Sequence, residues 1–292
     1  MPLIWLVGNR GMLGAEVEIL LKRHSYPYLA SDLEVDITDF ESLNHFIKGK
    51  FPTWIINCAA YTAVDRAEDE PEKAFAINAS GPGNLAQIAR DKGARLIHIS
   101  TDYVFDGTKN GAYVETDPPR PLGVYARSKY QGEIEIQTNI KEYFILRTAW
   151  LYGKNGSNFV ATMLKLFNER DYVTVVGDQW GSPTYAPDLA EAVLEIVRRD
   201  CMAYGIYHFT NEGLITWYDF ACEIYRQALE RGILTRKVSI RRITTEEYPT
   251  KAKRPKNAYL SKEKFIGTFE IIPRSLDSAL ADYFRSEGQR SW

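Results

Sequence analysis

The chain has 292 residues, of which 45% are hydrophobic and 25% charged, the composition of an ordinary globular protein. The formal net charge of -2 disfavours a generally basic nucleic-acid-binding protein, and no apolar run approaches the roughly 18 residues that a membrane helix needs. The three cysteines are scattered without a CxxC motif, and the four histidines lack metal-ligand spacing. We therefore expect a reduced, cytoplasmic protein with no bound metal, no nucleic-acid partner and no membrane partner.

In the first half of the chain, short apolar runs alternate with helix-like stretches. The runs predict strands at Leu3–Val7, Tyr28–Ala30, Trp54–Asn57, Leu96–Ser100 and Tyr143–Arg147. The stretches between them predict helices at Ala15–Arg23, Phe40–Lys48, Pro71–Asp91 and Val124–Thr138. Proline is favoured at a first helical position and glycine just past a helix end, so Pro71 and Gly93 mark the ends of the long third helix.

Strands separated by helices predict βαβ units and a parallel sheet. Continuous apolar strands are typical of a sheet covered by helices on both faces. We expect an α/β protein with a doubly wound, parallel Rossmann sheet and a smaller C-terminal α/β substrate-binding domain. Residues 1–150, with part of 170–210, would form the dinucleotide-binding domain, and residues 151–292 would mainly form the interleaved substrate domain.

The second half is less regular. Strands are predicted at Thr174–Val176, Ile206–Phe209 and Val238–Ile240, and helices at Pro187–Arg198 and Trp217–Leu229. Thr216 precedes the last of these helices and Asp219 follows three residues later, which is close to a capping box.

A glycine-rich turn links the first strand to the first helix. Its glycines, Gly8, Gly11 and Gly14, have the spacing G-x-x-G-x-x-G. Glycine allows a tight turn and lets backbone approach a pyrophosphate, while the free N–H groups of a helix N-terminus favour phosphate. An ordinary glycine turn is the alternative, but the flanking strand and helix favour dinucleotide binding.

Two charged residues bear on the choice of dinucleotide. Asp32 follows the second strand, where a carboxylate accepts hydrogen bonds from the adenosine ribose and repels a 2′-phosphate. Arg10, inside the glycine turn, would instead attract that phosphate. The choice between NADH and NADPH therefore stays open, and either residue could equally be a solvated surface charge.

Tyr125 and Lys129 form a Y-x-x-x-K motif in a predicted helix. Residues four apart share a helix face, and a nearby cation lowers a phenol pKa toward neutrality. Such a phenol can protonate a carbonyl oxygen as hydride arrives. The motif also occurs by chance, and its position after the fourth strand gives it weight.

The segment Ser100-Thr-Asp-Tyr103 ends the fourth strand, at the rim where such sheets bind ligands. A hydroxyl there can polarise a substrate carbonyl. Because Ser, Thr and Asp are common in strand-end turns, this segment alone favours an ordinary turn.

Together these features resemble the extended short-chain dehydrogenase/reductases, and within them the dTDP-4-dehydrorhamnose reductase family. The resemblance covers nearly the whole chain. It rests on the segments Gly8–Gly14, Asn57–Asp65, Ser100–Gly107, Tyr125–Lys129, Arg147–Gly153, Gly181–Thr184 and Arg254–Asn257.

The resemblance implies a role for each matching residue. Thr101, Tyr125 and Lys129 would be the catalytic residues, and Thr101, Asp102, Trp150 and Arg254 would bind the nucleotide sugar. The cofactor, NADH or NADPH, would be bound by Gly8, Arg10, Gly11, Met12, Leu13, Gly14, Asp32, Asp36, Ile37, Ala59, Ala60, Tyr61, Ser100, Tyr125 and Lys129. The implied reaction is reduction of the C4 ketone of dTDP-4-dehydro-L-rhamnose, in the synthesis of dTDP-L-rhamnose for cell-surface polysaccharide. Some relatives hold a divalent ion at a dimer contact, but no ligand cluster here supports one. The oligomeric state stays open, with a homodimer among the options.

Three alternatives remain. Nucleotide-sugar dehydratases follow the threonine with an Asp-Glu pair, whereas this chain has Asp102-Tyr103 and so lacks that acid/base group. An epimerase could use the same Tyr/Lys pair to oxidise and re-reduce one carbon. A non-catalytic regulatory subunit resembling the β subunit of methionine adenosyltransferase would keep the fold, although the intact Thr101, Tyr125 and Lys129 weaken this alternative.

Eight basic residues lie between Arg236 and Lys256. Tyr248 is the only aromatic residue there, which disfavours a nucleic-acid patch. Arg254 suits the diphosphate of a sugar nucleotide, and the others are expected to be a solvated face.

Overall fold

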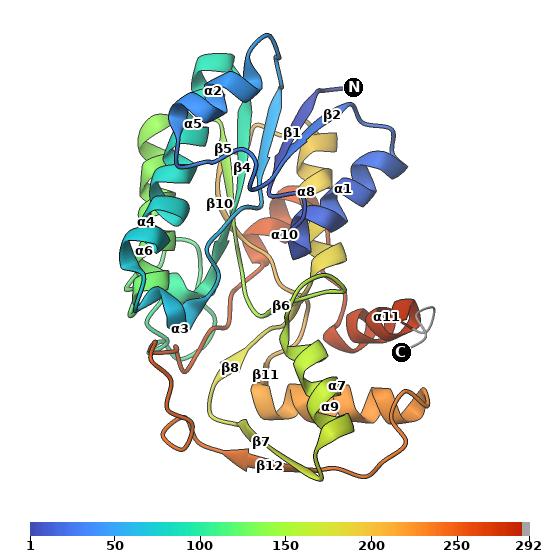
Figure 1. Cartoon of the computed structure of the whole chain (residues 1–292). Helices are drawn as coiled ribbons and strands as arrows, with labels where there is room; N and C mark the ends of the chain where they lie inside the picture. Colours follow the sequence, from blue (N-terminus) through green and yellow to red (C-terminus); the bar gives the residue numbers. More distant parts are fainter. Residues whose placement is uncertain (288–292) are drawn as a thin grey trace.

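The computed structural model describes residues 1–287. Its centre is a six-stranded parallel sheet in the order β10–β5–β4–β3–β1–β2 (Figure 1). The strands are β1 (Ile4–Val7), β2 (Tyr28–Ser31), β3 (Trp54–Asn57), β4 (Arg95–Thr101), β5 (Tyr143–Thr148) and β10 (Gly205–His208). The chain first adds β2 on one side of β1 and then β3 on the other, so β1 and β3 flank the switch point of a doubly wound sheet. The predicted α/β Rossmann-type class is confirmed.

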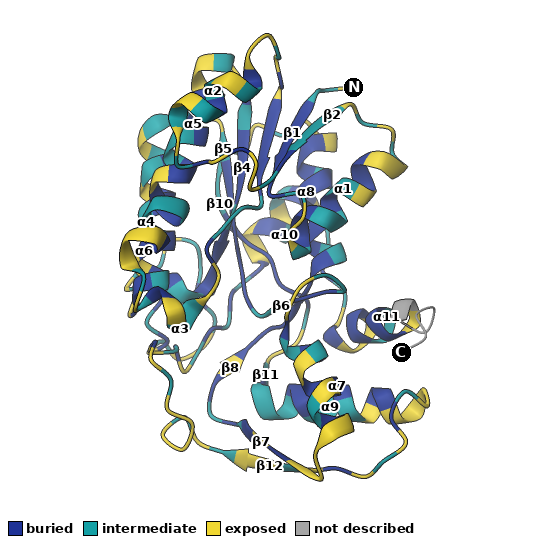
Figure 2. Ribbon diagram, viewed as in Figure 1, coloured by how far each residue is buried: buried dark blue, intermediate teal, exposed yellow. Residues whose placement is uncertain are grey.

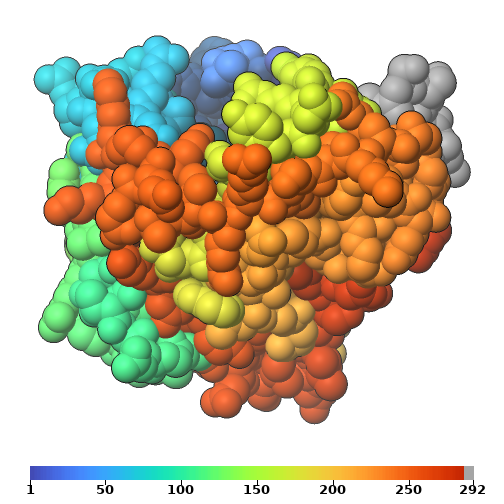
Figure 3. All heavy atoms as spheres, turned by 90° about the horizontal axis from the view of Figure 1, so that it is seen from below, coloured from blue at the N-terminus to red at the C-terminus, as the bar shows by residue number. Residues whose placement is uncertain are grey.

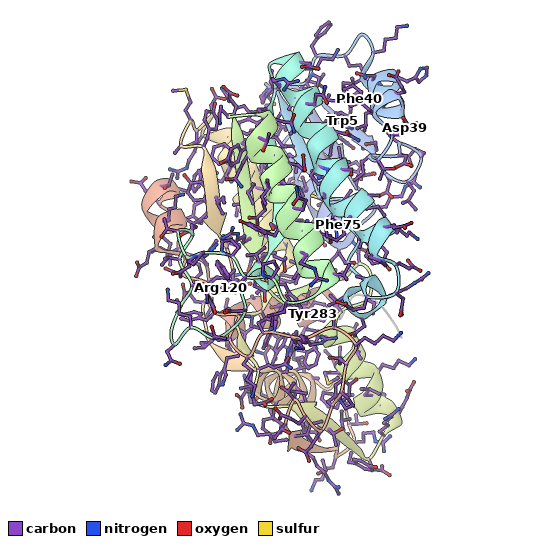
Figure 4. The ribbon with its side chains drawn as sticks, turned by 90° about the vertical axis from the view of Figure 1, so that its left-hand side faces the viewer. Trp5, Asp39, Phe40, Phe75, Arg120 and Tyr283 are labelled. Carbon is purple, nitrogen blue, oxygen red and sulfur yellow. The ribbon has the colours of Figure 1, made fainter. Side chains whose placement is uncertain are left out.

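Helices cover both faces of this sheet, which explains why its strands are apolar throughout (Figure 2). On one face, α1 (Met12–Arg23), α8 (Ala186–Arg198) and α10 (Glu263–Phe269) share a core with the strands. On the other face lie α2 (Phe40–Ile47), α5 (Gly81–Lys92) and α6 (Val124–Asn139). Figure 4 looks onto this second face, where α5 and α6 run side by side, and labels Trp5 and Phe40 from its core.

The long helix predicted at Pro71–Asp91 is confirmed in its extent, but it contains a π-helical turn that the sequence did not predict. It consists of α4 (Pro71–Phe75), a π-helical turn (Ala76–Ser80) and α5. Within the π turn, the side chain of Asn78 bonds both the N–H and the carbonyl of Tyr61. π turns commonly occur at functional sites. The predicted ends are confirmed: Pro71 lies in the first turn, and Gly93 ends α5 in the left-handed conformation (φ 64°).

The lower part of the molecule has its own apolar core, built mainly from α7 (Phe159–Glu169), α9 (Trp217–Glu230) and α11 (Leu276–Glu287) (Figure 1). Strand β7 (Tyr172–Val176) pairs in parallel with β12 (Ser239–Ile243). Two further two-residue pairs are β6 (Leu151–Tyr152) with β9 (Thr184–Tyr185) and β8 (Trp180–Gly181) with β11 (Ile215–Thr216). The capping box at Thr216 and Asp219 is confirmed at the start of α9.

The strand predicted at Ile206–Phe209 is β10, the edge of the main sheet, where it pairs with β5. The remaining short elements are α3 (Val64–Ala67) and a 3₁₀ turn at Asp102–Val104. None of the helices within residues 1–287 is both long and apolar enough to cross a bilayer. The same residues contain no group of three or more His, Cys, Asp or Glu side chains that could hold a metal ion.

Candidate active site

A cavity of about 520 Å³ opens at the switch point between β1 and β3. Its lining includes Gly8, Arg10, Gly11, Asp32, Asp36, Ile37, Ala59 and Ala60, which are eight of the predicted cofactor residues. Gly8 has φ 78°, and a Cβ at this position would lie 2.6 Å from the N atom of Ala59. A Cβ on Gly14 would lie 2.0 Å from the carbonyl oxygen of Gly8. Only glycine fits at these two positions, where backbone segments approach closely. Without side chains there, the backbone of the turn is open to a pyrophosphate.

The other predicted cofactor residues lie around this cavity rather than in its wall. Met12 and Leu13 are in the first turn of α1, and the Leu13 side chain is buried in the core, so only its backbone faces the turn. Tyr61 is held behind the cavity by Asn78 and donates its hydroxyl to Glu70 over 3.0 Å. The hydroxyl of Ser100 is buried without a partner among the described residues.

A hydrogen bond to the backbone joins Arg10 and Asp32, the two residues that bear on the choice of dinucleotide. Asp32 Oδ2 accepts a 2.9 Å hydrogen bond from the N–H of Arg10, and Oδ1 accepts one of 2.8 Å from the N–H of Leu33. The Arg10 side chain is 72% exposed and lies 3.5 Å from a carboxylate oxygen of Glu34. Asp32 therefore fixes the loop shape, while the exposed Arg10 guanidinium is paired with Glu34.

Thr101, Asp102 and Tyr103 leave β4 at the same rim. Thr101 Oγ1 donates to Asp102 Oδ1 over 2.9 Å, and Asp102 Oδ2 has no partner among residues 1–287. Burial raises the pKa of Asp102 to about 7. This carboxyl group can thus exist as a neutral acid near neutral pH, in which form it can donate to Thr101 instead of accepting.

Helix α6 presents Tyr125 beside Thr101. The ring of Tyr103 packs edge-on against that of Tyr125, with ring centroids 5.6 Å apart. Burial raises the pKa of Tyr125 above its ordinary value, and a hydrogen bond with Thr101 opposes this. The sequence predicted that Lys129 would lower this pKa, and that prediction was wrong for the geometry observed.

The reason is the direction of the Lys129 side chain. Its Nζ donates to the carbonyl oxygen of Ile99 over 2.7 Å and lies 3.2 Å from Nε2 of His98. Burial lowers the pKa of Lys129 to about 8. The ammonium charge is therefore directed toward β4 rather than toward the phenol of Tyr125.

Two contacts that sequence reasoning missed fix α6 in place. Glu68 of α3's C-terminal end accepts from the N–H of Val124 over 2.7 Å, at the helix N-terminus. Asn78 donates to the hydroxyl of Ser128, the residue before Lys129. A Cβ on Gly132 would lie 2.1 Å from the carbonyl oxygen of Asn78, so this glycine permits close contact with the π turn. Neither contact has a local sequence signal.

A second cavity, of about 970 Å³, lies between the loop after β4 and the segment after β12. Its wall carries basic and aromatic side chains, among them Lys109, Trp180, Lys253, Arg254, Lys256 and Tyr259. Figure 3 shows the chain around and after β12, in orange, lying across the underside of the molecule and reaching the cyan segment. At that contact Arg254 donates to Asp65 over 2.9 Å.

Thr101, Tyr125 and Lys129 are in the wall of neither cavity, but contacts through neighbouring side chains connect Tyr125 to the larger cavity and Lys129 to the smaller one. Arg254, in the wall of the larger cavity, interacts electrostatically with Tyr103, whose ring packs against Tyr125. Cys58, in the wall of the smaller cavity, interacts electrostatically with Lys129. The predicted Trp150 does not line either cavity. It stacks on Trp217 with centroids 3.5 Å apart and lies against Gly181.

The comparisons with known proteins agree with this geometry. The model of the RmlD substrate binding domain matches residues 2–288. The chain belongs to this family. It is 42% identical to a dTDP-4-dehydrorhamnose reductase of Aggregatibacter actinomycetemcomitans, over 96% of this chain and 97% of that protein. The resemblance stated from the sequence is thus confirmed.

Solved structures of the RmlD family have the same fold. A dTDP-4-dehydrorhamnose reductase from Clostridium acetobutylicum superposes with a TM-score of 0.93 at 40% identity, covering 98% of this chain and all of that one. A dTDP-4-dehydrorhamnose reductase from Bacillus anthracis, in complex with NADP, gives a TM-score of 0.91 at 36% identity, covering 98% and 99% of the two chains.

Proposed function

We propose that this chain reduces the C4 ketone of dTDP-4-dehydro-L-rhamnose to the alcohol of dTDP-L-rhamnose, using NADPH or NADH. The chain is an oxidoreductase of the RmlD family, and relatives that share its full length are named for this reaction. The observation that supports the proposal is a glycine-lined cavity and a basic, aromatic one, which contacts through neighbouring side chains connect to Tyr125 and Lys129.

The smaller cavity fits a dinucleotide because its glycines leave room that a Cβ would fill. Gly8, Gly11 and the start of α1 would hold the pyrophosphate, and Asp32 would face the adenosine ribose. The nicotinamide supplies hydride when bound. The larger cavity would hold the nucleotide sugar, with Arg254 suited to its diphosphate and Tyr259 and Trp180 offering rings for stacking.

The residues of this chain then supply the proton. Tyr125 donates its phenolic proton to the C4 oxygen, and Thr101 donates a hydrogen bond to the same oxygen. For this, Thr101 must stop donating to Asp102, and a neutral Asp102 allows it, because its carboxyl group can donate to Thr101. In its ammonium form, Lys129 would stabilise the developing phenolate through the low-dielectric interior rather than by direct contact, because its Nζ bonds to Ile99 and lies against His98.

Domain roles and assembly extend the same proposal. Residues 1–150, with part of 170–210, would hold the dinucleotide, and residues 151–292 would mainly hold the sugar, although residues 106–111 and Leu122 also line the larger cavity. We expect a cytoplasmic protein, to be tested by cell fractionation, and leave the oligomeric state, with a homodimer among the options, to light scattering.

The decisive variant is Tyr125→Phe. It should keep dinucleotide affinity, measured by fluorescence titration, while turnover of dTDP-4-dehydro-L-rhamnose falls by roughly 10²–10⁴, the usual contribution of a general acid. Tyr130→Phe is the matched control, because Tyr130 lies on the same helix but packs against the Val104–Phe105 cluster. Wild-type turnover in Tyr125→Phe would reject the assigned acid. Absence of turnover in the unaltered protein, with dinucleotide bound, would favour the regulatory-subunit alternative.

A further inference from the structure

Behind Lys129, three buried side chains form a continuous hydrogen-bonded chain. Asn57 and His98 are fully buried neighbours in the register of β3 and β4, and Lys129 is 2% exposed. Asn57 Nδ2 lies 3.0 Å from His98 Nδ1, and His98 Nε2 lies 3.2 Å from Lys129 Nζ. Because this chain is shielded from water, each of its hydrogen atoms must be matched by an acceptor.

The backbone fixes the orientation of the first member. The N–H of Ala59 donates to Asn57 Oδ1 over 3.0 Å. A flipped amide would place Nδ2, which can only donate, against this N–H donor. Asn57 therefore presents its NH₂ group to His98, and His98 Nδ1 must accept.

This orientation determines where the imidazole proton lies. Burial and the charge of Lys129 lower the pKa of His98 well below its usual value, so the ring is neutral and carries one proton. With Nδ1 accepting, that proton is on Nε2, which points at Lys129 Nζ. Such a donor matches the lone pair of an amine, whereas an ammonium group has no lone pair to accept it.

The other groups around Lys129 do not remove this mismatch. Cys58, from the end of β3, has a thiol whose pKa burial raises to about 12, so it is neutral. Glu133, one turn along α6, favours the ammonium form, but its carboxylate is held in a two-point pair with Arg147 of β5, at 2.9 and 2.6 Å. Two groups of β4 meet the amine directly, the carbonyl of Ile99 and the ring of His98. The carbonyl accepts from either form of Lys129, so His98 is the one that distinguishes amine from ammonium.

From this geometry we propose that Asn57 and His98 are a positioning pair that stabilises the amine form of Lys129 and thereby sets the upper pH limit of the reaction. The inference rests on the proposed function, since it assigns Lys129 a role as an ammonium during turnover. Neither member of the pair touches the substrate; both act through Lys129. Loss of the Nε2–H donor should stabilise the ammonium form of Lys129 relative to its amine form.

The first test reads the tautomer without any turnover. The protein contains four histidines, so selective ¹⁵N-histidine labelling and His98→Phe assign the His98 signals. At about pH 9, where the amine dominates, the wild-type spectrum should show the proton on Nε2. A proton on Nδ1 would overturn the proposal. Because this measurement needs no substrate, it stands even if the proposed reaction fails.

The second test uses the pH dependence of kcat/KM, which reports ionisation of the free enzyme. His98→Phe removes the donor and should move the alkaline limb up by about one pH unit, the equivalent of one hydrogen bond. If His98 instead accepted from an ammonium, the same variant would move the limb down. A downward or absent shift would therefore overturn the proposal.

Two further variants complete the design. Asn57→Asp should also move the limb up, because a carboxylate can accept from both Ala59 and His98 Nδ1 and so frees Nε2 to accept from an ammonium. This variant keeps the test available if His98→Phe does not fold. His208→Phe is the matched control. His208 is equally buried but lies on β10, which β5 separates from β4, so the alkaline limb of this variant should not move.

Discussion

Replacing Asp102 with asparagine tests whether the ionised carboxylate of Asp102, at the rim of the sheet, destabilises the folded protein. Asp102 is 2% exposed, and its Oδ2 has no partner among the described residues. Burial raises its pKa from 3.8 to about 7. The folded protein therefore keeps a proton that the unfolded chain has already lost between about pH 4 and about pH 7.

Proton linkage gives the direction and the size of the change in the free energy of unfolding with pH. Because the folded state binds more protons, the free energy of unfolding should fall as pH rises through this window. From about pH 5 to about pH 7 there are two pH units, each worth roughly 1.4 kcal/mol. Asparagine cannot ionise, so the stability of Asp102→Asn relative to wild type should rise by roughly 2–3 kcal/mol between about pH 5 and about pH 8.

The assay is urea unfolding of both proteins at the two pH values, with tryptophan fluorescence as the signal. Asp117→Asn is the control. Hydrogen bonds from Lys109 and Val114 lower the pKa of Asp117, so the stability that its carboxylate contributes is lost only at more acidic pH. Asp117→Asn should therefore lose the same stability at both pH values. A difference between Asp102→Asn and wild type that does not change with pH would refute the reasoning.

Two other substitutions test the cofactor turn and the support of α6. Gly14→Ala would place a Cβ 2.0 Å from a backbone carbonyl of the glycine turn, so the dissociation constant for NADPH should rise by at least ~10-fold in fluorescence titrations. Gly267→Ala, which meets open space, should leave it unchanged. Glu133→Gln would leave Arg147 buried without its carboxylate, so urea unfolding should show a loss of roughly 3–5 kcal/mol. Glu195 is partly buried, but its partners Arg198 and Arg199 are exposed to solvent, so Glu195→Gln should lose under about 1 kcal/mol. Equal losses in the two variants would contradict this explanation.

The sheet was predictable because its strands carry a local signal. Residues such as Ile4–Val7 and Trp54–Asn57 are buried on both faces, so each strand is a short, continuous apolar run. The short pairs of the lower part have no such signal. β6 and β9 have two residues each, and their pairing depends on chain segments about 30 residues apart.

The site was predictable to the level of motifs but not of side-chain direction. Spacing placed Tyr125 and Lys129 on one helix face, as the structure has them. It could not show that the amine turns to Ile99 and His98, because that depends on the depth of burial of β4. The π turn at Asn78 was also missed, since the sequence there is compatible with a regular helix.

The late position of β10 in the chain constrains how this protein is made. Residues Gly205–His208 complete the edge of a sheet whose other five strands end by Thr148, and α8 covers the face beside α1. During synthesis the N-terminal half therefore leaves the ribosome with one strand edge unpaired and one apolar face covered only by α1. The dinucleotide-binding half cannot finish folding until more than two hundred residues have been translated, so its assembly is tied to that of the remainder.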